Sequence, residues 1–220
     1  MTDEIGFRTL RTEGSRILLN DKEIFCRGIS IHEETPYDSD TRLKFLSSLA
    51  SKARSLDDVR LIGAAMEKVE IRPGVMTVND PLGDVLDIIS FNEYVGWYDG
   101  DSEKCDRVEW QFSGDKPVFI SEFGGGALYG HHGPADERFT EEYQEDLYRR
   151  LIGMLKRIPA LAGTTPWILK DFRSPRRQIP FIQDDFNRKG LISDKGQKKK
   201  AYYVLRDWYE SIARGSHTPE

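Results

Sequence analysis

One short segment carries an apolar run directly into a carboxylate and then into three glycines. Residues 117–126 read Pro-Val-Phe-Ile-Ser-Glu-Phe-Gly-Gly-Gly, which places Glu122 at the end of a predicted strand. A carboxylate in this position, followed by glycines that let a ligand approach the backbone, suits the nucleophile of a glycosidase. Taken alone, the same residues fit a glutamate that caps a helix or pairs with an arginine equally well. The glycines are not a phosphate-binding loop, because no Gly-Lys-Ser/Thr follows them.

The elements that must position Glu122 alternate between apolar runs and amphipathic stretches. Strands are predicted at residues 16–19, 23–31, 61–66, 86–91, 118–121 and 161–169. Helices are predicted at residues 43–56, 101–112, 198–213 and from Thr140 onward. This alternation favours an α/β fold with a parallel sheet and outer helices. Chemistry in such folds gathers where strands end, which selects residues 32–33, 92–98, 122–126 and 167–173.

The bulk properties exclude several classes of function. The chain has 220 residues and a formal net charge of -5, so neither nucleic acid nor a membrane is the expected partner. Residues 1–11 are polar and unlike a secretory signal, and Cys26 and Cys105 are read as free thiols, which together predict a cytoplasmic protein. Residues 1–213 are expected to form one domain, and residues 214–220 a disordered tail.

Five ordered segments resemble the catalytic barrel of glycoside hydrolase family 2, the family of β-glucuronidases and β-galactosidases. They are residues 28–34 (Gly-Ile-Ser-Ile-His-Glu-Glu), 90–98 (Ser-Phe-Asn-Glu-Tyr-Val-Gly-Trp-Tyr), 120–124 (Ile-Ser-Glu-Phe-Gly), 165–172 (Thr-Pro-Trp-Ile-Leu-Lys-Asp-Phe), and 186–190 with 199–201. The resemblance implies a partial or rearranged TIM (β/α)8-type barrel with parallel strands and outer helices. It also implies a retaining hydrolase that acts on β-glucuronides or β-galactosides, without a cofactor.

The same resemblance assigns a role to several side chains. Glu122 would attack the anomeric carbon, and Asn92 and Tyr94 would lie beside the reacting sugar. His32 would border the sugar pocket, and Trp167 would form its floor by stacking on the ring. Without the family context, His32 and Trp167 would be read as core packing.

A second motif concerns the sugar's carboxylate. Asn187-x-Lys189 resembles the pair with which β-glucuronidases hold a uronate, and an amide next to an ammonium suits that carboxylate. The arginines at positions 173, 176 and 177 add positive charge nearby in sequence. A charged, solvated loop is the alternative interpretation. The three lysines at 198–200 are interpreted as a solvated helix start.

The sequence also departs from the family pattern. A complete barrel takes about 250 residues, and the segment that would follow Glu34 and carry the general acid/base is absent before Leu43. Glu93 follows Asn92 but should face the opposite side of its strand, and Glu33 and Glu34 are further candidates for the acid. The adjacent His131 and His132 lack companions for a metal site.

These departures leave alternatives open. A catalytically impaired carbohydrate-binding or scaffold protein is the second hypothesis, and a remnant with neither function is the third. An incomplete sheet would expose strand edges, which predicts self-association as a homo-oligomer.

Overall fold

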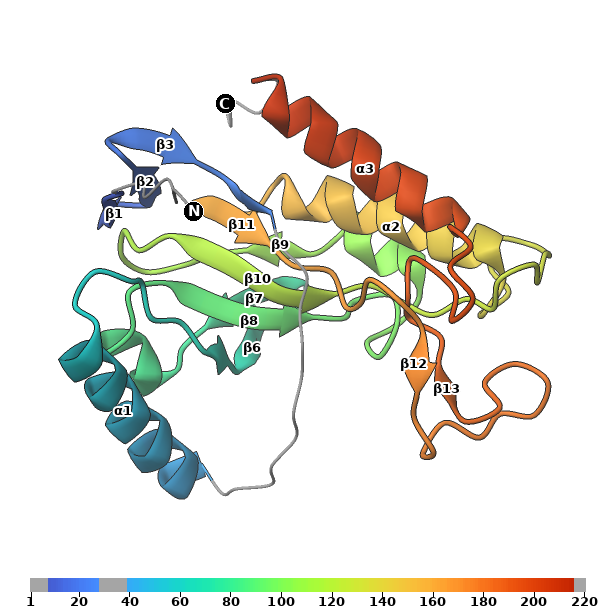
Figure 1. The fold of residues 1–220 in the computed structure, drawn as a ribbon, viewed down its shortest axis with the longest axis horizontal. Coiled ribbons are helices and arrows are strands. Elements are labelled where there is room, and N and C mark those ends of the chain that lie inside the picture. Colours follow the sequence, from blue (N-terminus) through green and yellow to red (C-terminus); the bar gives the residue numbers. More distant parts are fainter. Residues whose placement is uncertain (1–7, 28–38, 216–220) are drawn as a thin grey trace, which may run out of the picture.

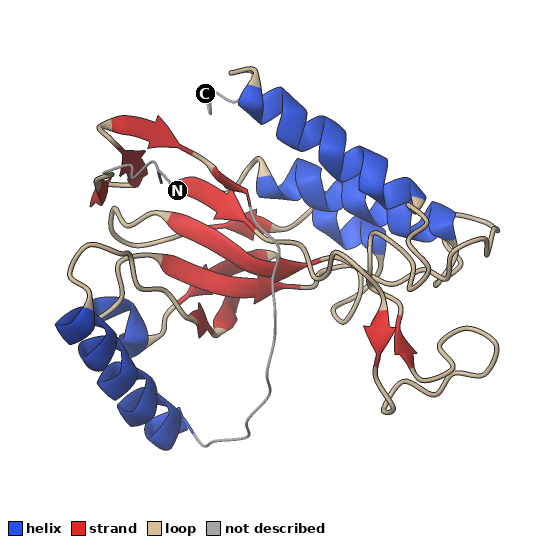
Figure 2. Ribbon diagram, viewed as in Figure 1, coloured by secondary structure: helices blue, strands red, loops and turns tan. Residues whose placement is uncertain are grey.

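The computed structural model describes residues 8–27 and 39–215, and its centre is a five-stranded sheet. The strands lie in the order β4 (Cys26–Arg27), β11 (Leu161–Thr164), β10 (Val118–Phe123), β8 (Ile89–Glu93) and β5 (Ala65–Met66). All four pairings are parallel (Figures 1 and 2). The predicted α/β class with a parallel sheet is therefore confirmed. A closed barrel is not: among the described strands, β4 and β5 form the two edges of the sheet.

Strand β10 runs through the middle of this sheet, where neighbouring strands cover both of its edges. Val118, Ile120 and Phe123 are each fully buried, as expected for a strand in a parallel sheet with helices packed on it. The strand pairs with β8 in a register that places Glu122 opposite Asn92. The carboxyl ends of β8 and β10 therefore lie side by side, and each presents residues of the predicted site.

Two long helices cover one face of the sheet, α2 (Glu141–Leu155) and α3 (Lys200–Ala213) (Figure 1). The hydroxyl of Thr140 accepts a hydrogen bond from the backbone N–H of Tyr143 and so caps the start of α2. One apolar cluster joins these helices to β8 and β10, and its buried members include Phe91, Ile120, Leu147, Leu151 and Trp208. This cluster is the main core, and it fixes the helices against the strands that carry the candidate site.

The third helix, α1 (Ser39–Leu56), packs at the β5 edge of the sheet. Ala50 shares a smaller buried cluster with Met66 of β5 and with Leu82 of the 3₁₀ helix η1 (Pro81–Asp84). The guanidinium of Arg42 also donates to the Asp80 carboxylate at 2.9 Å. The predicted helix at residues 43–56 is thus confirmed, and it begins four residues earlier than expected.

Three smaller sheets complete the fold. An antiparallel sheet near the N-terminus contains β1 (Leu10–Glu13), β2 (Arg16–Leu19) and β3 (Lys22–Ile24). A second sheet contains β6 (Lys68–Arg72), β7 (Val75–Val78) and β9 (Glu109–Trp110). The strands β12 (Phe172–Arg173) and β13 (Phe186–Asn187) form a pair beyond the carboxyl ends of the central strands (Figure 1).

The helix predicted over residues 101–112 is wrong. A short 3₁₀ helix, η2 (Ser102–Asp106), is followed by strand β9, which pairs with β7. The indole of Trp110 stacks on Phe91 with 4.6 Å between ring centroids, so a tertiary contact of an aromatic residue decides the local structure.

Two predicted strands are shorter than expected. Only Ala65–Met66 of residues 61–66 joins the sheet. Strand β11 ends at Thr164, just before Pro166, which has no N–H to donate to a ladder. In the described part of the chain, no helix is both long and apolar enough to cross a lipid bilayer.

Candidate active site

The carboxylate of Glu122 is bonded to a tyrosine from the neighbouring strand end. Tyr94 directly follows β8, and its hydroxyl donates a hydrogen bond to Oε2 of Glu122 at 2.8 Å. Glu122 is 8% exposed, so the carboxylate lies at the end of β10 with little access to bulk water. The strand pairing thus brings together two residues that sequence analysis assigned to one site.

Asn92 lies opposite Glu122 in the register of the two strands. Its side-chain oxygen accepts a hydrogen bond from the hydroxyl of Ser121 at 2.7 Å. A register irregularity between Ile120 and Glu122 accompanies this contact. The amide of Asn92 is therefore held against β10, one residue before Glu122.

The ammonium of Lys189 lies among three aromatic rings near Glu122. Its nitrogen is 4.3 Å from the ring centroid of Tyr98, 5.0 Å from that of Tyr94 and 5.8 Å from that of Trp97. Lys189 is 4% exposed, and this burial lowers its pKa, while Tyr98 and Glu122 act in the opposite direction. A cation and an anion thus share Tyr94 as a common neighbour.

Tyr98 is a site residue to which sequence analysis gave no role. The backbone turns after Tyr94 at Gly96, where φ is 82°, and this brings the Tyr98 ring to 5.1 Å from the Tyr94 ring. Its hydroxyl accepts hydrogen bonds from Lys189 and, at 3.3 Å, from Arg177. Burial raises the pKa of Tyr98, but these two cations outweigh it and the net shift is downward. The repeat of tyrosine four residues after Tyr94 was the available signal.

Asn187 is buried, and its side-chain oxygen accepts a hydrogen bond from the backbone N–H of Lys189 at 3.1 Å. This contact closes the turn that presents the Lys189 side chain. The two residues of the predicted uronate motif therefore do lie together: Asn187 ends β13, and Lys189 lies on the loop that follows.

Trp167 follows β11 and is 7% exposed. Its backbone N–H donates to the carbonyl of Phe123 at 2.9 Å, and its indole meets Phe172 edge to face with centroids 6.0 Å apart. The peptide bond between Trp167 and Ile168 is cis. The backbone of Trp167 is thus hydrogen-bonded to the end of β10, at the residue that follows Glu122.

The glycine triplet after Glu122 has a structural reason that differs from the expected one. A Cβ atom at Gly124 would lie 2.4 Å from the hydroxyl of Tyr148, and one at Gly125 would lie 2.7 Å from the indole of Trp97. Side chains of the protein therefore fill the space beside Gly124 and Gly125. These two glycines admit the packing of α2 and of the Tyr94–Tyr98 turn, instead of leaving room there for a ligand.

Glu93 lies on the other side of the strand from Tyr94, as its position in the alternation predicts. Its carboxylate is fully buried, 2.9 Å from the ammonium of Lys68, and it accepts the backbone N–H of Val95 at 2.6 Å. Burial raises the pKa of Glu93, and Lys68 opposes that shift. Glu93 is thus held away from Glu122 by bonds of its own.

The remaining candidates take no part in the contacts around Glu122 that the structure describes. His32, Glu33 and Glu34 lie outside the described residues. His131 and His132 contact Glu137 and Glu142, at 3.8 and 2.9 Å. Within residues 8–27 and 39–215, no group of three or more His, Cys, Asp and Glu side chains is arranged to hold a metal ion.

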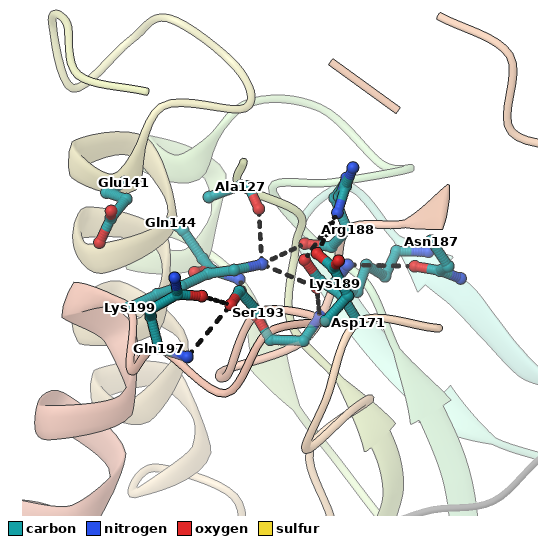
Figure 3. A network of polar contacts seen from close by, with 12 residues as sticks. Ala127, Glu141, Gln144, Asp171, Asn187, Arg188, Lys189, Ser193, Gln197 and Lys199 are labelled. Atoms are coloured by element: carbon teal, nitrogen blue, oxygen red, sulfur yellow. Dashed lines mark hydrogen bonds and ion pairs between the residues drawn. The ribbon is translucent and has the colours of Figure 1, made fainter. Parts of the chain in front are cut away.

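The lysine run at 198–200 was interpreted wrongly at one position. Lys199 is fully buried, and Figure 3 shows its ammonium surrounded by carbonyl and carboxylate oxygens. The nitrogen lies 2.6 Å from the Ala127 carbonyl, 2.8 Å from the Asp171 carboxylate and 3.0 Å from the Arg188 carbonyl. A run of lysines gave no sequence signal that its middle member points inward.

Comparison with known proteins shows which proteins the chain is similar to. No family model matches the chain. The β-glucuronidase of Paenibacillus borealis is 30% identical over 190 residues, which cover 82% of this chain and 30% of that protein. In sequence, the chain is similar to β-glucuronidases. Human β-glucuronidase is 30% identical over 148 residues, or 61% of this chain and 22% of the relative.

Solved structures of related enzymes share the fold. A β-glucuronidase from Ruminococcus gnavus, in complex with an N1-substituted uronic isofagomine, superposes with a TM-score of 0.72 at 17% identity and covers 94% of this chain and 52% of its own. A GH2 β-galacturonidase from Eisenbergiella tayi bound to galacturonate gives 0.71 at 19% identity, over 95% and 55%. The chain therefore spans about half of those solved chains and about 30% of the first curated relative.

Proposed function

We propose that this chain is a retaining β-glycoside hydrolase whose substrate is a β-glucuronide, with Glu122 as the nucleophile. The observation that carries the proposal is the position of Lys189, a buried ammonium that shares the Tyr94 ring with the Glu122 carboxylate. A sugar that carries a carboxylate suits this pair, because its acid group meets the cation while its anomeric carbon meets Glu122. The β-glucuronidase relatives support the same substrate class.

In this mechanism an oxygen of Glu122 attacks the anomeric carbon and the aglycone oxygen departs. A covalent glycosyl-enzyme forms, and water then releases the sugar with the original configuration. Tyr94 donates its hydrogen bond to the carboxylate and fixes the direction of the attacking oxygen. Asn92, held against Ser121, would border the reacting sugar, and Trp167 would close the pocket next to it.

Departure of the aglycone oxygen needs a proton, and Glu93 is bonded to Lys68 on the other side of the strand. Substrates with acidic leaving groups, such as 4-nitrophenyl glycosides, need little protonation and are the ones we expect the chain to cleave. Alkyl glycosides, whose leaving groups are strong bases, should be cleaved far more slowly.

The experiment that tests the function is hydrolysis of 4-nitrophenyl β-D-glucuronide and β-D-galactoside by the purified chain and by its Glu122→Gln variant. The variant should lose turnover while it keeps its thermal unfolding temperature. Glu145→Gln, on the outer part of α2 beside Arg149, is the matched control and should behave as wild type. Equal activity in Glu122→Gln would remove this residue as the nucleophile, and a preference for the galactoside would contradict the uronate assignment.

The role of Lys189 has its own test. Lys189→Met should raise the KM for the glucuronide and leave the KM for 4-nitrophenyl β-D-glucoside nearly unchanged, because only the first sugar has a carboxylate. Lys195→Met, at an exposed lysine in the turn before α3, is the control. An equal rise in both KM values would contradict carboxylate binding by Lys189.

A second candidate function is carbohydrate binding without turnover. The observation that favours it is again Glu93, because a glutamate tied to Lys68 and Val95 cannot also serve as the acid at Glu122. Calorimetric titration with glucuronate distinguishes the two functions. Heat of binding that Lys189→Met abolishes, together with an inert wild-type chain, would establish the binding protein; absence of binding and of turnover would leave neither function.

The architecture supports a further part of the proposal. We infer that residues 1–213 form one domain, in which the five parallel strands are an arc of a (β/α)8-type barrel with its outer helices. The edges that β4 and β5 form among the described strands would then pair with a second copy of the chain. Light scattering tests this self-association, and a monomer at all concentrations would contradict it.

Cys26 and Cys105 are both free thiols, which supports a reducing, cytoplasmic location.

A further inference from the structure

The ammonium of Lys199 is a buried junction between three loops. Its three acceptors come from the loop after β10 (Ala127), the segment after β11 (Asp171) and the loop after β13 (Arg188). An ammonium has three N–H donors, so every donor of Lys199 is used. Two of these segments carry a residue of the candidate site: the second contains Trp167 and the third contains Lys189. The first follows β10, the strand that bears Glu122.

Asp171 is the second half of the junction. Its carboxylate is fully buried and accepts from Lys199 at 2.8 Å and from the backbone N–H of Gly190 at 2.9 Å. Its other oxygen is 3.5 Å from the guanidinium of Arg188, which also donates to Asp194 at 2.9 Å. Figure 3 shows Lys199, Asp171 and Arg188 close together between the loops.

The two members of the pair hold opposite sides of the same residue. Lys199 donates to the carbonyl of Arg188, which belongs to the peptide unit before Lys189. Asp171 accepts from the N–H of Gly190, which belongs to the peptide unit after it. Both peptide planes that flank the Lys189 Cα are therefore fixed by one buried ion pair, and these planes determine the direction in which its side chain leaves the backbone.

We infer that Lys199 and Asp171 are positioning residues that hold the Lys189 ammonium beside the Tyr94 ring, close to Glu122. In this way they set the selectivity for sugars that carry a carboxylate. The selectivity rests on the proposed function; the positioning of Lys189 does not. Neither residue touches the substrate. Their effect passes through the backbone on both sides of Lys189 and through Ala127, which connects the same ammonium to the strand that bears Glu122.

Stability alone is a weak reason for such a pair. Removing two charges from water is costly, and well-packed apolar side chains in the place of a buried ion pair often give equal stability. An ammonium with three fixed acceptors, however, defines the relative positions of three loops, which apolar contacts do far less sharply. The buried ion pair, although costly to desolvate, therefore lies at the point where the geometry of the site is set.

The positioning is tested without any sugar, by reductive methylation of the folded chain and peptide mass mapping. Lys189 should be protected in wild type, because it is 4% exposed, and should become reactive in Lys199→Met. Lys116 is the internal reference. It donates to the carbonyls of Gly83 and Leu86 at the other end of β10, and its reactivity should stay the same.

A second variant guards against a folding defect. Lys199→Met leaves the Asp171 carboxylate with less compensation, whereas the double variant Asp171→Asn/Lys199→Met removes both charges and keeps similar side-chain volumes. Thermal unfolding shows which variant is folded at the labelling temperature. Lys189 that stays protected in the folded variants overturns the inference, whatever the sugar measurements give.

The selectivity is tested with the glucuronide and the glucoside together. In either folded variant the ratio of kcat/KM for the two substrates should fall at least about tenfold, mostly through the KM of the glucuronide, because a displacement of about 1 Å has effects of this size or larger. Equal losses on both substrates, or an unchanged ratio with Lys189 reactive, would overturn the selectivity role. If Lys189 becomes reactive but the wild-type chain neither cleaves nor binds glucuronides, the proposed function fails and the positioning stands.

Discussion

The hydroxyl of Tyr94 lies 2.8 Å from Oε2 of Glu122 and donates a hydrogen bond to it across the β8–β10 pairing. Burial raises the pKa of Tyr94 far above its usual value, and the negative charge of Glu122 raises it further. Tyr94 therefore stays protonated over the working range of any enzyme. In this arrangement its hydroxyl is the donor and the Glu122 carboxylate the acceptor.

Tyr94→Phe removes only this donor and keeps the ring that borders Lys189. A hydrogen bond to a charged group is worth roughly 1.5–3 kcal/mol, so kcat on 4-nitrophenyl β-D-glucuronide should fall about 10- to 100-fold. Tyr202→Phe, on α3 beside Lys198, is a matched loss of a hydroxyl away from the site and should leave kcat unchanged. Steady-state kinetics measure both, and an unaltered kcat in Tyr94→Phe would show that the bond does not act in the rate-limiting step.

The pair between Lys68 and Glu93 predicts a large cost for one substitution. Lys68→Met leaves the Glu93 carboxylate, which is fully buried, without its cation. Removal of one partner of a buried pair costs about 3–5 kcal/mol, which urea unfolding at pH 7 will measure. Lys104→Met removes a cation from the more exposed Asp99 and should cost less than about 1 kcal/mol. Similar losses in the two variants would contradict the difference in burial.

The loss of stability in Lys68→Met should depend on pH. Burial already raises the pKa of Glu93 in the folded protein, and the loss of Lys68 removes an interaction that lowers it. An acid whose pKa is higher in the folded state stabilises the fold below its unfolded pKa and loses that contribution as the pH rises through the folded pKa. The deficit of Lys68→Met should therefore shrink between pH 7 and pH 5. A constant deficit would mean that Glu93 does not take up a proton.

The lowered pKa of Glu142 predicts the opposite dependence of stability on pH. The ammonium of Lys200, at 2.7 Å, is the main cause that lowers the pKa of Glu142 from 4.5 to about 2, and His132 and the Gly133 N–H add to it. A lowered carboxyl pKa contributes stability above pH 4.5, which is lost as the pH falls toward 2.

Glu142→Gln should therefore lower the free energy of unfolding at pH 6, and its difference from wild type should vanish as the pH approaches 2. Urea unfolding at a series of pH values measures this. Glu145→Gln is the control on the same helix, because Glu145 pairs only with the exposed Arg149 among the contacts described. A difference that grows in acid would reverse the assigned direction of the shift.

Much of the fold follows from the sequence, because the pattern of apolar residues is dense in the central strands. The run from Val118 to Ser121 predicts β10, and Thr140 marks the start of α2. The mixed sheet of β6, β7 and β9, in which β7 pairs antiparallel with β6 and parallel with β9, does not follow from this pattern. Its strand β6 is mostly exposed, and β9 depends on the stacking of Trp110 on Phe91, a contact between distant parts of the chain.

The site divides in the same way. The positions of Tyr94 and Glu122 at the ends of β8 and β10 predict that both belong to the site, because side chains at the strand ends of a parallel sheet converge. Tyr98 and Lys199 were missed for physical reasons. Tyr98 reaches the site only through the turn at Gly96, and Lys199 points inward only because Asp171 and two carbonyls are assembled around it by distant segments. The first condition depends on the backbone conformation at one glycine, and the second is not local in sequence.

The final prediction concerns Gly190, which follows Lys189 in the loop. A Cβ atom at this position would lie 2.2 Å from the backbone nitrogen of Asp171 and 2.5 Å from the carbonyl oxygen of Ile192. Both are backbone atoms, so the loop must move away from the segment after β11. Gly190→Ala should lower the free energy of unfolding by about 3 kcal/mol or more, at the upper end of overpacking effects. It should also raise the KM for the glucuronide, since the displaced residue neighbours Lys189.

Gly153→Ala is the control that separates crowding from a general sensitivity to lost glycines. Gly153 lies within α2, and a Cβ there would meet no atom within 4 Å. Alanine in a helix interior is favoured over glycine by roughly 0.5–1 kcal/mol, so this variant should be more stable than wild type. Urea unfolding of both variants gives the two signs in one experiment. A stabilising Gly190→Ala would mean that the loop holding Lys189 is not pressed against Asp171, and the fixed direction of the Lys189 side chain would lose its structural basis.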